Sequence, residues 1–365
     1  MAICNACGVE LRQGARFCDM CGTKVYKICP SCGEVLRDIA KFCDLCGEKL
    51  PAERIVTVKR TVQGGVSAGK DHTVGLKSDG TVVATGDNRF GQCEVSGWTD
   101  VVAVAAGKNH TVAVRRDGTV LAAGDRSQGQ CEVSGWSDVV AVAAGKNHTV
   151  AVRRDGTVLA VGDRSQGQCE VSGWTDVVAV AAGDYHTVGL KSDGTVLAAG
   201  RPTDNKCKVG DWKGIVAVAA GVEHTLGLTQ NGQVVAAGEG MFGSCNVGDW
   251  NNITAIAAGH IHTVGIHKSG QVVEADAFAA PGVLAWTDMA AVAVSPFHTV
   301  GLRNDGTVLA SGDVQFGQCA VEDWADVALV AVGERHTVAV NKDGTVVAVG
   351  DDANGQCNVS GWKLW

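Results

Sequence analysis

The stretch "AAGKNHTVAV" at residues 105–114 returns unchanged at residues 143–152. Its His-Thr pair, followed by Val or Leu, recurs along the whole chain after residue 62. The copies begin at His72, His110, His148, His186, His224, His262, His298 and His336. Their spacing is 38 residues throughout, except for 36 residues before His298. A fixed period of this length predicts a repeat architecture rather than one irregular core.

Tryptophan keeps the same period, with one residue in each repeat. The positions are Trp98, Trp136, Trp174, Trp212, Trp250, Trp286, Trp324 and Trp362. Residues 101–138 and 139–176 differ only at Ala123/Val161 and Ser137/Thr175, which indicates a recent internal duplication. The repeat therefore extends well beyond the histidine motif.

Each repeat divides into short strands. In the second repeat we expect "VVAVAAG" to form strand A, "HTVAVRR" strand B, "TVLAAG" strand C and the residues around "CEV" a short strand D. The Asp-Gly pair between strands B and C is a hairpin signal, because glycine accepts a positive φ. No repeat is long or apolar enough to fold alone, so sheets stacked radially and closed into a ring would bury their faces. The sequence thus predicts an all-β fold.

"AAGKNHTVAV", together with "DGTVLAAGDRSQGQ", resembles the repeat of the regulator-of-chromosome-condensation β-propellers, which include guanine-exchange factors. The short period is similar to that of bacterial members of this superfamily, such as the propeller-shaped β-lactamase inhibitor proteins. The resemblance covers residues 62–365 and implies a β-propeller. Such relatives usually have seven blades, but eight copies predict eight, with seven as the alternative. Residues 55–62, "IVTVKRTV", are a possible ring-closing strand.

The first fifty residues carry a different pattern, four CxxCG motifs in two similar halves. We expect their thiolates to hold two structural Zn²⁺ ions, since two such motifs close a tetrahedral shell of four sulfur ligands. The predicted ligands are Cys4, Cys7, Cys18, Cys21, Cys29, Cys32, Cys43 and Cys46. A closed shell leaves no open position for catalysis. The segment resembles the double zinc ribbons of many prokaryotic proteins, and a disulfide cluster is the alternative.

The expected domains are zinc ribbons at residues 1–25 and 26–50, a linker at 51–61 and the propeller at 62–365. Residues 1–60 hold 10 Lys and Arg against 7 Asp and Glu, a formal charge of +3. Eight thiolates and two Zn²⁺ ions would add −4, giving −1, which supports phosphate binding only weakly. The ribbons could contact a protein, bind nucleic acid or serve as a spacer.

A residue that recurs eight times around a ring does not suit a single catalytic or metal site. We expect the histidine rings to bond backbone groups beside the A–B turn and the tryptophans to wedge between sheets. Seven further cysteines, from Cys93 to Cys357, should pack as small apolar residues, with a redox role as the alternative. No Ser-His-Asp order, phosphate-binding glycine loop or HExxH motif is present. We therefore expect a protein that is not an enzyme.

Strand parity places the A–B and C–D loops on one face of the ring, which we call the loop face. These loops vary between repeats, whereas the turns of the opposite face are nearly uniform. Exposed aromatic residues together with charged ones, arginine above all, are typical of protein interfaces. The predicted partner-binding residues are Lys70, Lys108, Asn109, Arg126, Lys146, Arg164, Tyr185, Glu223, Phe242, Phe278, Phe297, Phe316 and Arg335.

The net charge of −8 gives no general reason to bind nucleic acid or an anionic membrane. The N-terminus lacks a secretory signal pattern, and the apolar runs are too short to span a bilayer. We expect a cytoplasmic monomer that acts as a scaffold for a protein partner. The alternatives are a nucleic-acid-associated regulator acting through the ribbons, and a regulator or inhibitor of an enzyme or GTPase.

Overall fold

The computed structural model describes residues 65–201, 205–240, 243–275 and 282–365, together with five short strands nearer the N-terminus. The chain divides into two compact units, Met1–Gly64 and Gly65–Trp365. In the first unit, β1 (Ala2–Ile3) pairs with β2 (Glu10–Leu11). A second sheet places β3 (Val25–Ile28) between β4 (Val35–Leu36) and β5 (Ile55–Thr57). The predicted zinc ligands lie outside the described residues.

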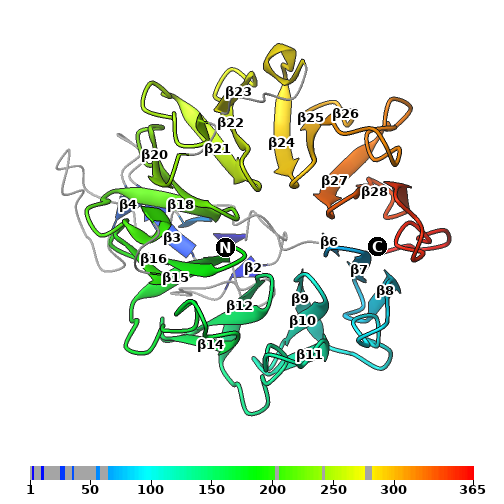
Figure 1. The fold of residues 1–365 in the computed structure, drawn as a ribbon, viewed down its shortest axis with the longest axis horizontal. Helices are drawn as coiled ribbons and strands as arrows, with labels where there is room; N and C mark the ends of the chain where they lie inside the picture. Colours follow the sequence, from blue (N-terminus) through cyan, green and yellow to red (C-terminus); the bar gives the residue numbers. More distant parts are fainter. Residues whose placement is uncertain are drawn as a thin grey trace. The chain divides into compact units, whose positions relative to one another are not determined.

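The second unit consists of eight three-stranded antiparallel sheets arranged around a common centre (Figure 1). Blades 1 to 4 contain β6 (Val66–Ala68), β7 (His72–Leu76), β8 (Val82–Gly86); β9 (Val101–Ala106), β10 (His110–Arg115), β11 (Val120–Gly124); β12 (Val139–Ala144), β13 (His148–Arg153), β14 (Val158–Gly162); and β15 (Val177–Ala182), β16 (His186–Lys191), β17 (Val196–Gly200). Blades 5 to 8 contain β18 (Ile215–Ala220), β19 (His224–Thr229), β20 (Val234–Gly238); β21 (Ile253–Ala258), β22 (Thr263–His267), β23 (Val272–Ala275); β24 (Met289–Val294), β25 (His298–Arg303), β26 (Val308–Gly312); and β27 (Val327–Val332), β28 (His336–Asn341), β29 (Val346–Gly350). The predicted all-β propeller of eight blades is confirmed.

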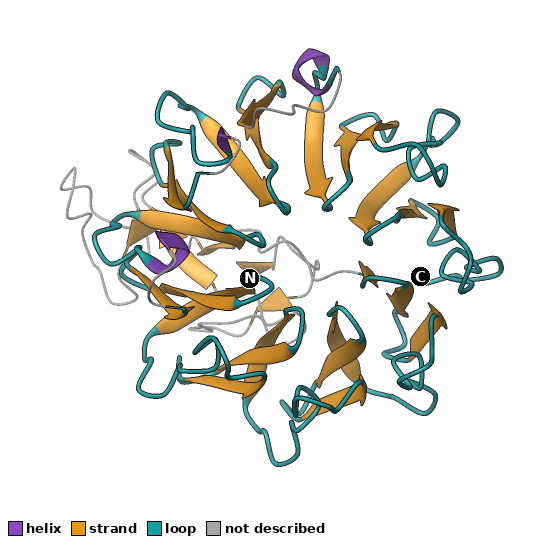
Figure 2. Ribbon diagram, in the orientation of Figure 1, coloured by secondary structure: helices purple, strands orange, loops and turns teal. Residues whose placement is uncertain are grey.

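The expected strand D is not present in the described blades. The residues around "CEV" form consecutive turns, in which the amide of Glu94 donates to Gly91 and the amide of Trp98 donates to Val95. Gly91 and Gly97 both have a φ of 82°, a left-handed conformation that ends an extended run on each side. The short helices η1 (Asn205–Cys207) and η3 (Val283–Ala285) occupy the corresponding stretches of blades 4 and 6 (Figure 2). No helix in the described part of the chain is long and apolar enough to cross a membrane.

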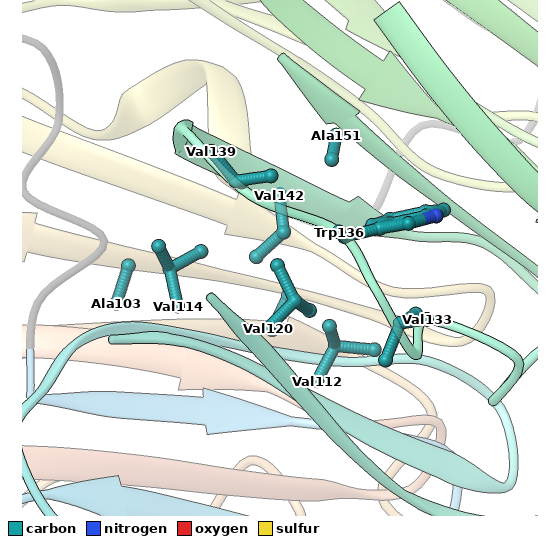
Figure 3. Packing of buried hydrophobic residues seen from close by; sticks show 10 residues of the cluster. Ala103, Val112, Val114, Val120, Val133, Trp136, Val139, Val142 and Ala151 are labelled. Carbon is teal, nitrogen blue, oxygen red and sulfur yellow. The ribbon is translucent and has the colours of Figure 1, made fainter. Parts of the chain in front are cut away.

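The hydrophobic core lies mainly between neighbouring blades. Around β10, the side chains of Val112 and Val114 pack with Trp136 and with Val142 of the next blade (Figure 3). At the next seam, a Cβ placed on Gly189 of β16 would come within 2.7 Å of the ring of Trp174. The tryptophans therefore fill the seams between sheets, as the sequence predicted.

The ring closes between blade 8 and blade 1. β6 packs against β27 and β28, and the amide of Ser78 donates to the backbone oxygen of Leu364 at 2.6 Å. The predicted ring-closing stretch begins in β5, which instead pairs with β3 in the first unit. The β-branched residues of Ile55–Thr57 do form a strand, but it pairs with β3, which is closer to it in sequence than blade 8.

Candidate functional site

The recurrent histidines join the blades to one another. His110 at the start of β10 is fully buried, and its Nε2 lies 3.0 Å from Oγ1 of Thr149 in the next blade. The hydroxyl of Thr149 donates to the backbone oxygen of Gln130 at 2.7 Å, so its oxygen must accept a hydrogen bond from the Nε2–H group of His110. The prediction that the histidine rings bond the backbone directly was therefore wrong. The ring nitrogen donates to a threonine hydroxyl, and this hydroxyl donates to the backbone.

Seven of the eight seams carry this His–Thr bond, at 2.8–3.0 Å. The exception among the described residues is the seam between blades 6 and 7. There the buried Oγ1 of Thr299 has no hydrogen-bond partner among the described residues, and His262 is only partly buried. The seam between blades 6 and 7 is consequently distinct from the rest of the ring.

Burial keeps these histidines neutral. Loss of hydration lowers the pKa of His72 to about 3 and the pKa of His110 to about 4. Their Nδ1 atoms face a glycine backbone, because a Cβ on Gly107 would lie 2.6 Å from Nδ1 of His110. A buried imidazole with no access to solvent suits a structural link rather than proton transfer to a substrate.

The A–B and C–D loops meet at one face, as strand parity predicted. The amide of Asp125, which begins a C–D loop, donates to Asn109 in the A–B loop of the same blade at 2.9 Å. At the other end, the amide of Val139 donates to Gly118 in the B–C turn at 3.0 Å. The variable loops therefore form one continuous surface.

A cavity of about 520 Å³ opens at the centre of the loop face. Its lining includes alanine and valine residues at the ends of the A strands, such as Ala106 and Val332. Its rim carries lysines on blades 1 to 3, and Asp184, Glu223 and Glu334 on blades 4, 5 and 8. The lysines of blades 1 to 3 thus form a basic arc at the mouth of the cavity, and acidic residues lie on both sides of this arc.

The predicted partner-binding residues fall into three groups. The cavity is lined by Lys70, Lys108, Lys146, Tyr185, Glu223 and Phe297. Asn109, Arg126, Arg164, Phe316 and Arg335 belong to the same loops but do not line the cavity. Phe242 and Phe278 lie outside the described residues. Participation of all of these residues in binding stays a prediction.

Two clusters of these side chains are in direct contact. The guanidinium carbon of Arg335 lies 5.3 Å from the ring centre of Phe297 and 4.9 Å from that of Phe316. On the opposite arc, Nζ of Lys146 lies 4.5 Å from the ring centre of Tyr185 and donates to its hydroxyl. Both are cation–π contacts between residues of adjacent blades.

Lys206 is a site residue that sequence analysis missed. Its side chain is only 3% exposed, and Nζ lies 3.1 Å from Oε2 of Glu223 and 5.8 Å from the ring centre of Tyr185. A signal was available, since Lys206 stands where blades 1 to 3 have Gln92, Gln130 and Gln168. A buried lysine at this position holds Glu223 at the rim of the cavity.

Burial raises the thiol pKa of six propeller cysteines: Cys93, Cys131, Cys169, Cys245, Cys319 and Cys357. Burial raises the pKa of Cys93 to about 12 and the pKa of Cys131 to about 11. The Sγ atom of Cys131 lies 3.2 Å from the backbone oxygen of Asp125 and donates to it. These contacts favour packing over the redox alternative.

Comparison with known proteins agrees with this architecture. The family model for the regulator of chromosome condensation (RCC1) repeat matches residues 65–92, 101–130, 139–168, 177–206, 215–243 and 327–356, and the double zinc ribbon model matches residues 4–47. The chain is an RCC1-repeat β-propeller with an N-terminal double zinc ribbon. No match was found among curated protein sequences.

Two solved structures with TM-scores above 0.5 support the propeller fold. The ectodomain of the receptor kinase CR4 from Physcomitrella patens has 20% identity and a TM-score of 0.53, with 68% of this chain and 72% of that chain covered. The ectodomain of ACR4 from Arabidopsis thaliana has 18% identity and a TM-score of 0.52, with 68% and 93% covered. Prp20p from Saccharomyces cerevisiae has 20% identity and a TM-score of 0.49, with 75% and 81% covered.

RCC1-like propellers typically bind proteins, often as scaffolds or as GTPase regulators, and the repeat family is mostly non-catalytic. The double zinc ribbon implies zinc binding. Four CxxC pairs supply the eight thiolates that two tetrahedral Zn²⁺ sites require. Ligation by the individual cysteines stays a prediction, because their side chains lie outside the described residues.

Proposed function

We propose that this protein is a non-catalytic scaffold that binds a protein partner through the loop face of its propeller. The observation that supports the proposal most is the contrast between the two faces. The loop face gathers the residues that differ between blades around one cavity, whereas the opposite face repeats the same turns. A surface that varies on an otherwise uniform ring is where selective recognition can reside.

The chemistry of the loop face fits this role. Phe297, which contacts the guanidinium of Arg335, is 36% exposed, and Val314 in the C–D loop of the same blade is 69% exposed. Arginine and aromatic side chains dominate the binding energy of protein interfaces. The cavity is lined by both apolar and charged residues, which suits an inserted loop or side chain of a partner.

A matched pair of triple variants tests the proposal. One combines Tyr185→Ala, Phe297→Ala and Arg335→Ala on the loop face, and the other combines Arg154→Ala, Lys213→Ala and Lys268→Ala on the opposite face. Affinity purification with quantitative mass spectrometry should show that the first variant loses specific partners that the second retains. If both variants retain the same partners while unfolding at the wild-type temperature, the loop face is not the binding surface.

A further inference from the structure

Arg335 contacts two rings, Phe297 and Phe316, whereas Lys146 contacts only the ring of Tyr185. The position of Arg335 is Asp71 in blade 1, Asn109 in blade 2 and Asn147 in blade 3. The position of Phe297 is equally variable, since it is the same position one blade earlier. Blades 7 and 8 therefore carry a cluster that the repeat itself does not require, which we call the arginine clamp (Phe297, Phe316 and Arg335).

The clamp joins side chains from three loops of two adjacent blades. Phe297 comes from the A–B loop of blade 7, and Phe316 from the C–D loop of the same blade. The guanidinium of Arg335, from blade 8, lies within 5.3 Å of both ring centres. Contact with two rings restricts the rotamers of a long side chain, which reduces the entropy lost on binding.

The guanidinium has no carboxylate partner within the described part of the chain. Two acidic residues of the C–D loops of blades 7 and 8 are bonded locally: Oδ1 of Asp313 accepts from the amide of Gln315 at 2.8 Å, and Oδ1 of Asp351 accepts from the amide of Ala353 at 3.0 Å. No ion pair joins Arg335 to the adjacent Glu334 among the described residues. Ring contacts do not use the planar N–H donors of arginine, and these donors match a carboxylate bidentately. The clamp is thus a cation held in place with its donors available.

Exposed apolar side chains belong to the same loops as the clamp. Val314, at 69%, is the most exposed of the large hydrophobic side chains in the described residues. It follows Asp313, whose amide donates to the backbone oxygen of Phe297 at 2.8 Å. Phe297 belongs both to the clamp and to the wall of the central cavity. An apolar side chain of a partner would therefore be covered by Phe297 and Val314 while a neighbouring carboxylate meets Arg335.

Further along the rim, the lysines of the basic arc offer additional positive charge to an acidic partner. Lys70, Lys108 and Lys146 line the cavity on blades 1 to 3, which follow blade 8 around the ring. Lys70 and Lys146 have acidic neighbours at 3.4 and 3.6 Å, whereas no ion pair involves Lys108 among the described residues. A segment that leaves the clamp toward blade 2 would meet a second available cation there.

We propose that the loop face holds an acidic, apolar segment of its protein partner, with an Asp or Glu carboxylate on Arg335 and the adjoining apolar side chain against Phe297 and Val314. This inference rests on the proposed function and specifies the chemistry of the partner. Its ligand is a protein segment in which acidic and apolar residues alternate. A polyanion without apolar side chains would meet only half of the site.

Three synthetic peptides of equal length test the inference with the zinc-loaded full-length protein. One alternates Leu and Glu, one Ser and Glu, and one Leu and Lys, each with a fluorescent label for anisotropy. We expect the Leu/Glu peptide to bind about tenfold more tightly than either of the others. Its affinity should fall as salt rises, because the carboxylate–guanidinium contact is partly exposed.

Variants then assign the binding to the clamp. Arg335→Gln should reduce the affinity for the Leu/Glu peptide about tenfold, and Phe297→Ala should remove most of the preference for Leu over Ser. Arg335→Lys keeps the charge but not the planar donors, so it should fall between the wild type and Arg335→Gln. Arg154→Gln, on the opposite face, is the control and should bind as the wild type does.

Four results would overturn the inference. They are equal binding of the Leu/Glu and Ser/Glu peptides, tighter binding of the Leu/Lys peptide, no measurable binding of any peptide, and displacement of the Leu/Glu peptide by single-stranded DNA at equal charge. None of these results bears on whether the loop face binds a protein. A loop-face triple variant that keeps all its partners would instead contradict the proposed function itself.

Discussion

At the scale of single residues, the histidine motif works as a link between blades. His298 shows this well, because its Nε2 bonds Thr337 in the next blade at 2.8 Å and Thr337 bonds the backbone of Gln318 at 2.7 Å. The sequence predicted a structural role from the recurrence of histidine. It could not reveal the partner, since the threonine lies 39 residues away and follows a histidine in every copy. Only the closed ring brings the two side chains together.

The matched threonines of blades 7 and 8 test the link. Thr337→Val should lower the free energy of unfolding by about 2–4 kcal/mol, because it leaves the ring N–H of His298 and the oxygen of Gln318 unpaired in the interior. Thr299→Val removes a buried hydroxyl that has no partner among the described residues, so its effect should lie between zero and a stabilisation of about 1 kcal/mol. Urea unfolding followed by tryptophan fluorescence measures both. Equal destabilisation by the two variants would show that the His–Thr bond is not the source of the effect.

The buried histidines also predict acid sensitivity. Burial holds the pKa of His72 near 3 and the pKa of His298 near 4, below the unfolded value of 6.5. The unfolded chain therefore binds more protons below pH 6.5, and stability falls as the pH drops through that value toward 4. Each such histidine costs about 1.4 kcal/mol per pH unit within this window.

We therefore expect the propeller to unfold cooperatively well above pH 4. All nine tryptophans lie at residue 98 or later, so their fluorescence reports on the propeller and not on the zinc ribbons. Urea unfolding at pH 7 and pH 5.5 should show a clear loss of stability at the lower pH. A free energy of unfolding that stays constant between these values would contradict the assignment of neutral, buried histidines.

At the scale of strands, the sequence correctly predicted strands A, B and C of each blade. Its prediction of a fourth strand, D, was wrong. The stretch after strand C contains the β-branched residue Val133 and has the composition of a short strand. In the structure it forms turns, because glycines at φ near 80° on both sides, such as Gly129 and Gly135, redirect the chain. Local composition could not show that both glycines adopt this conformation.

The tryptophans are tightly packed in the seams between blades, so even one added methyl group there should destabilise the protein. Gly189→Ala in β16 would place a Cβ 2.7 Å from the ring of Trp174 and should destabilise the protein by about 1–3 kcal/mol. Gly210→Ala is the control, because no atom lies within 4 Å of the Cβ that it would add. Chemical denaturation compares the two. If Gly189→Ala is as stable as the control, the seam is less tightly packed than the structure indicates.

At the scale of the whole molecule, the repeat predicted the propeller and its eight blades directly, since each motif marks one sheet. The loop face also followed from strand parity. The clusters on it did not: Arg335 meets two phenylalanines from the neighbouring blade, and Lys206 holds Glu223 from inside. Such contacts depend on distances across a seam, which a single sequence does not specify.

The zinc ribbons make a separate prediction. Metal analysis of the purified protein should give two Zn²⁺ per chain, and Cys4→Ser should lower this to about one, because it opens one shell of four thiolates. Cys93→Ser, in the propeller, is the matched control and should keep both ions. A zinc content that is the same in both variants would contradict the assignment of Cys4 as a ligand.

The central claim is that the loop face binds a protein, and hydrogen exchange tests it most directly. Once a partner has been purified, exchange is measured by mass spectrometry for the propeller alone and for the complex. We predict slower exchange in the A–B and C–D loops around Lys70, Phe297 and Arg335, with no change in the B–C turns such as residues 77–81. Protection confined to the B–C turns, with the loops exchanging as in the free protein, would contradict the claim.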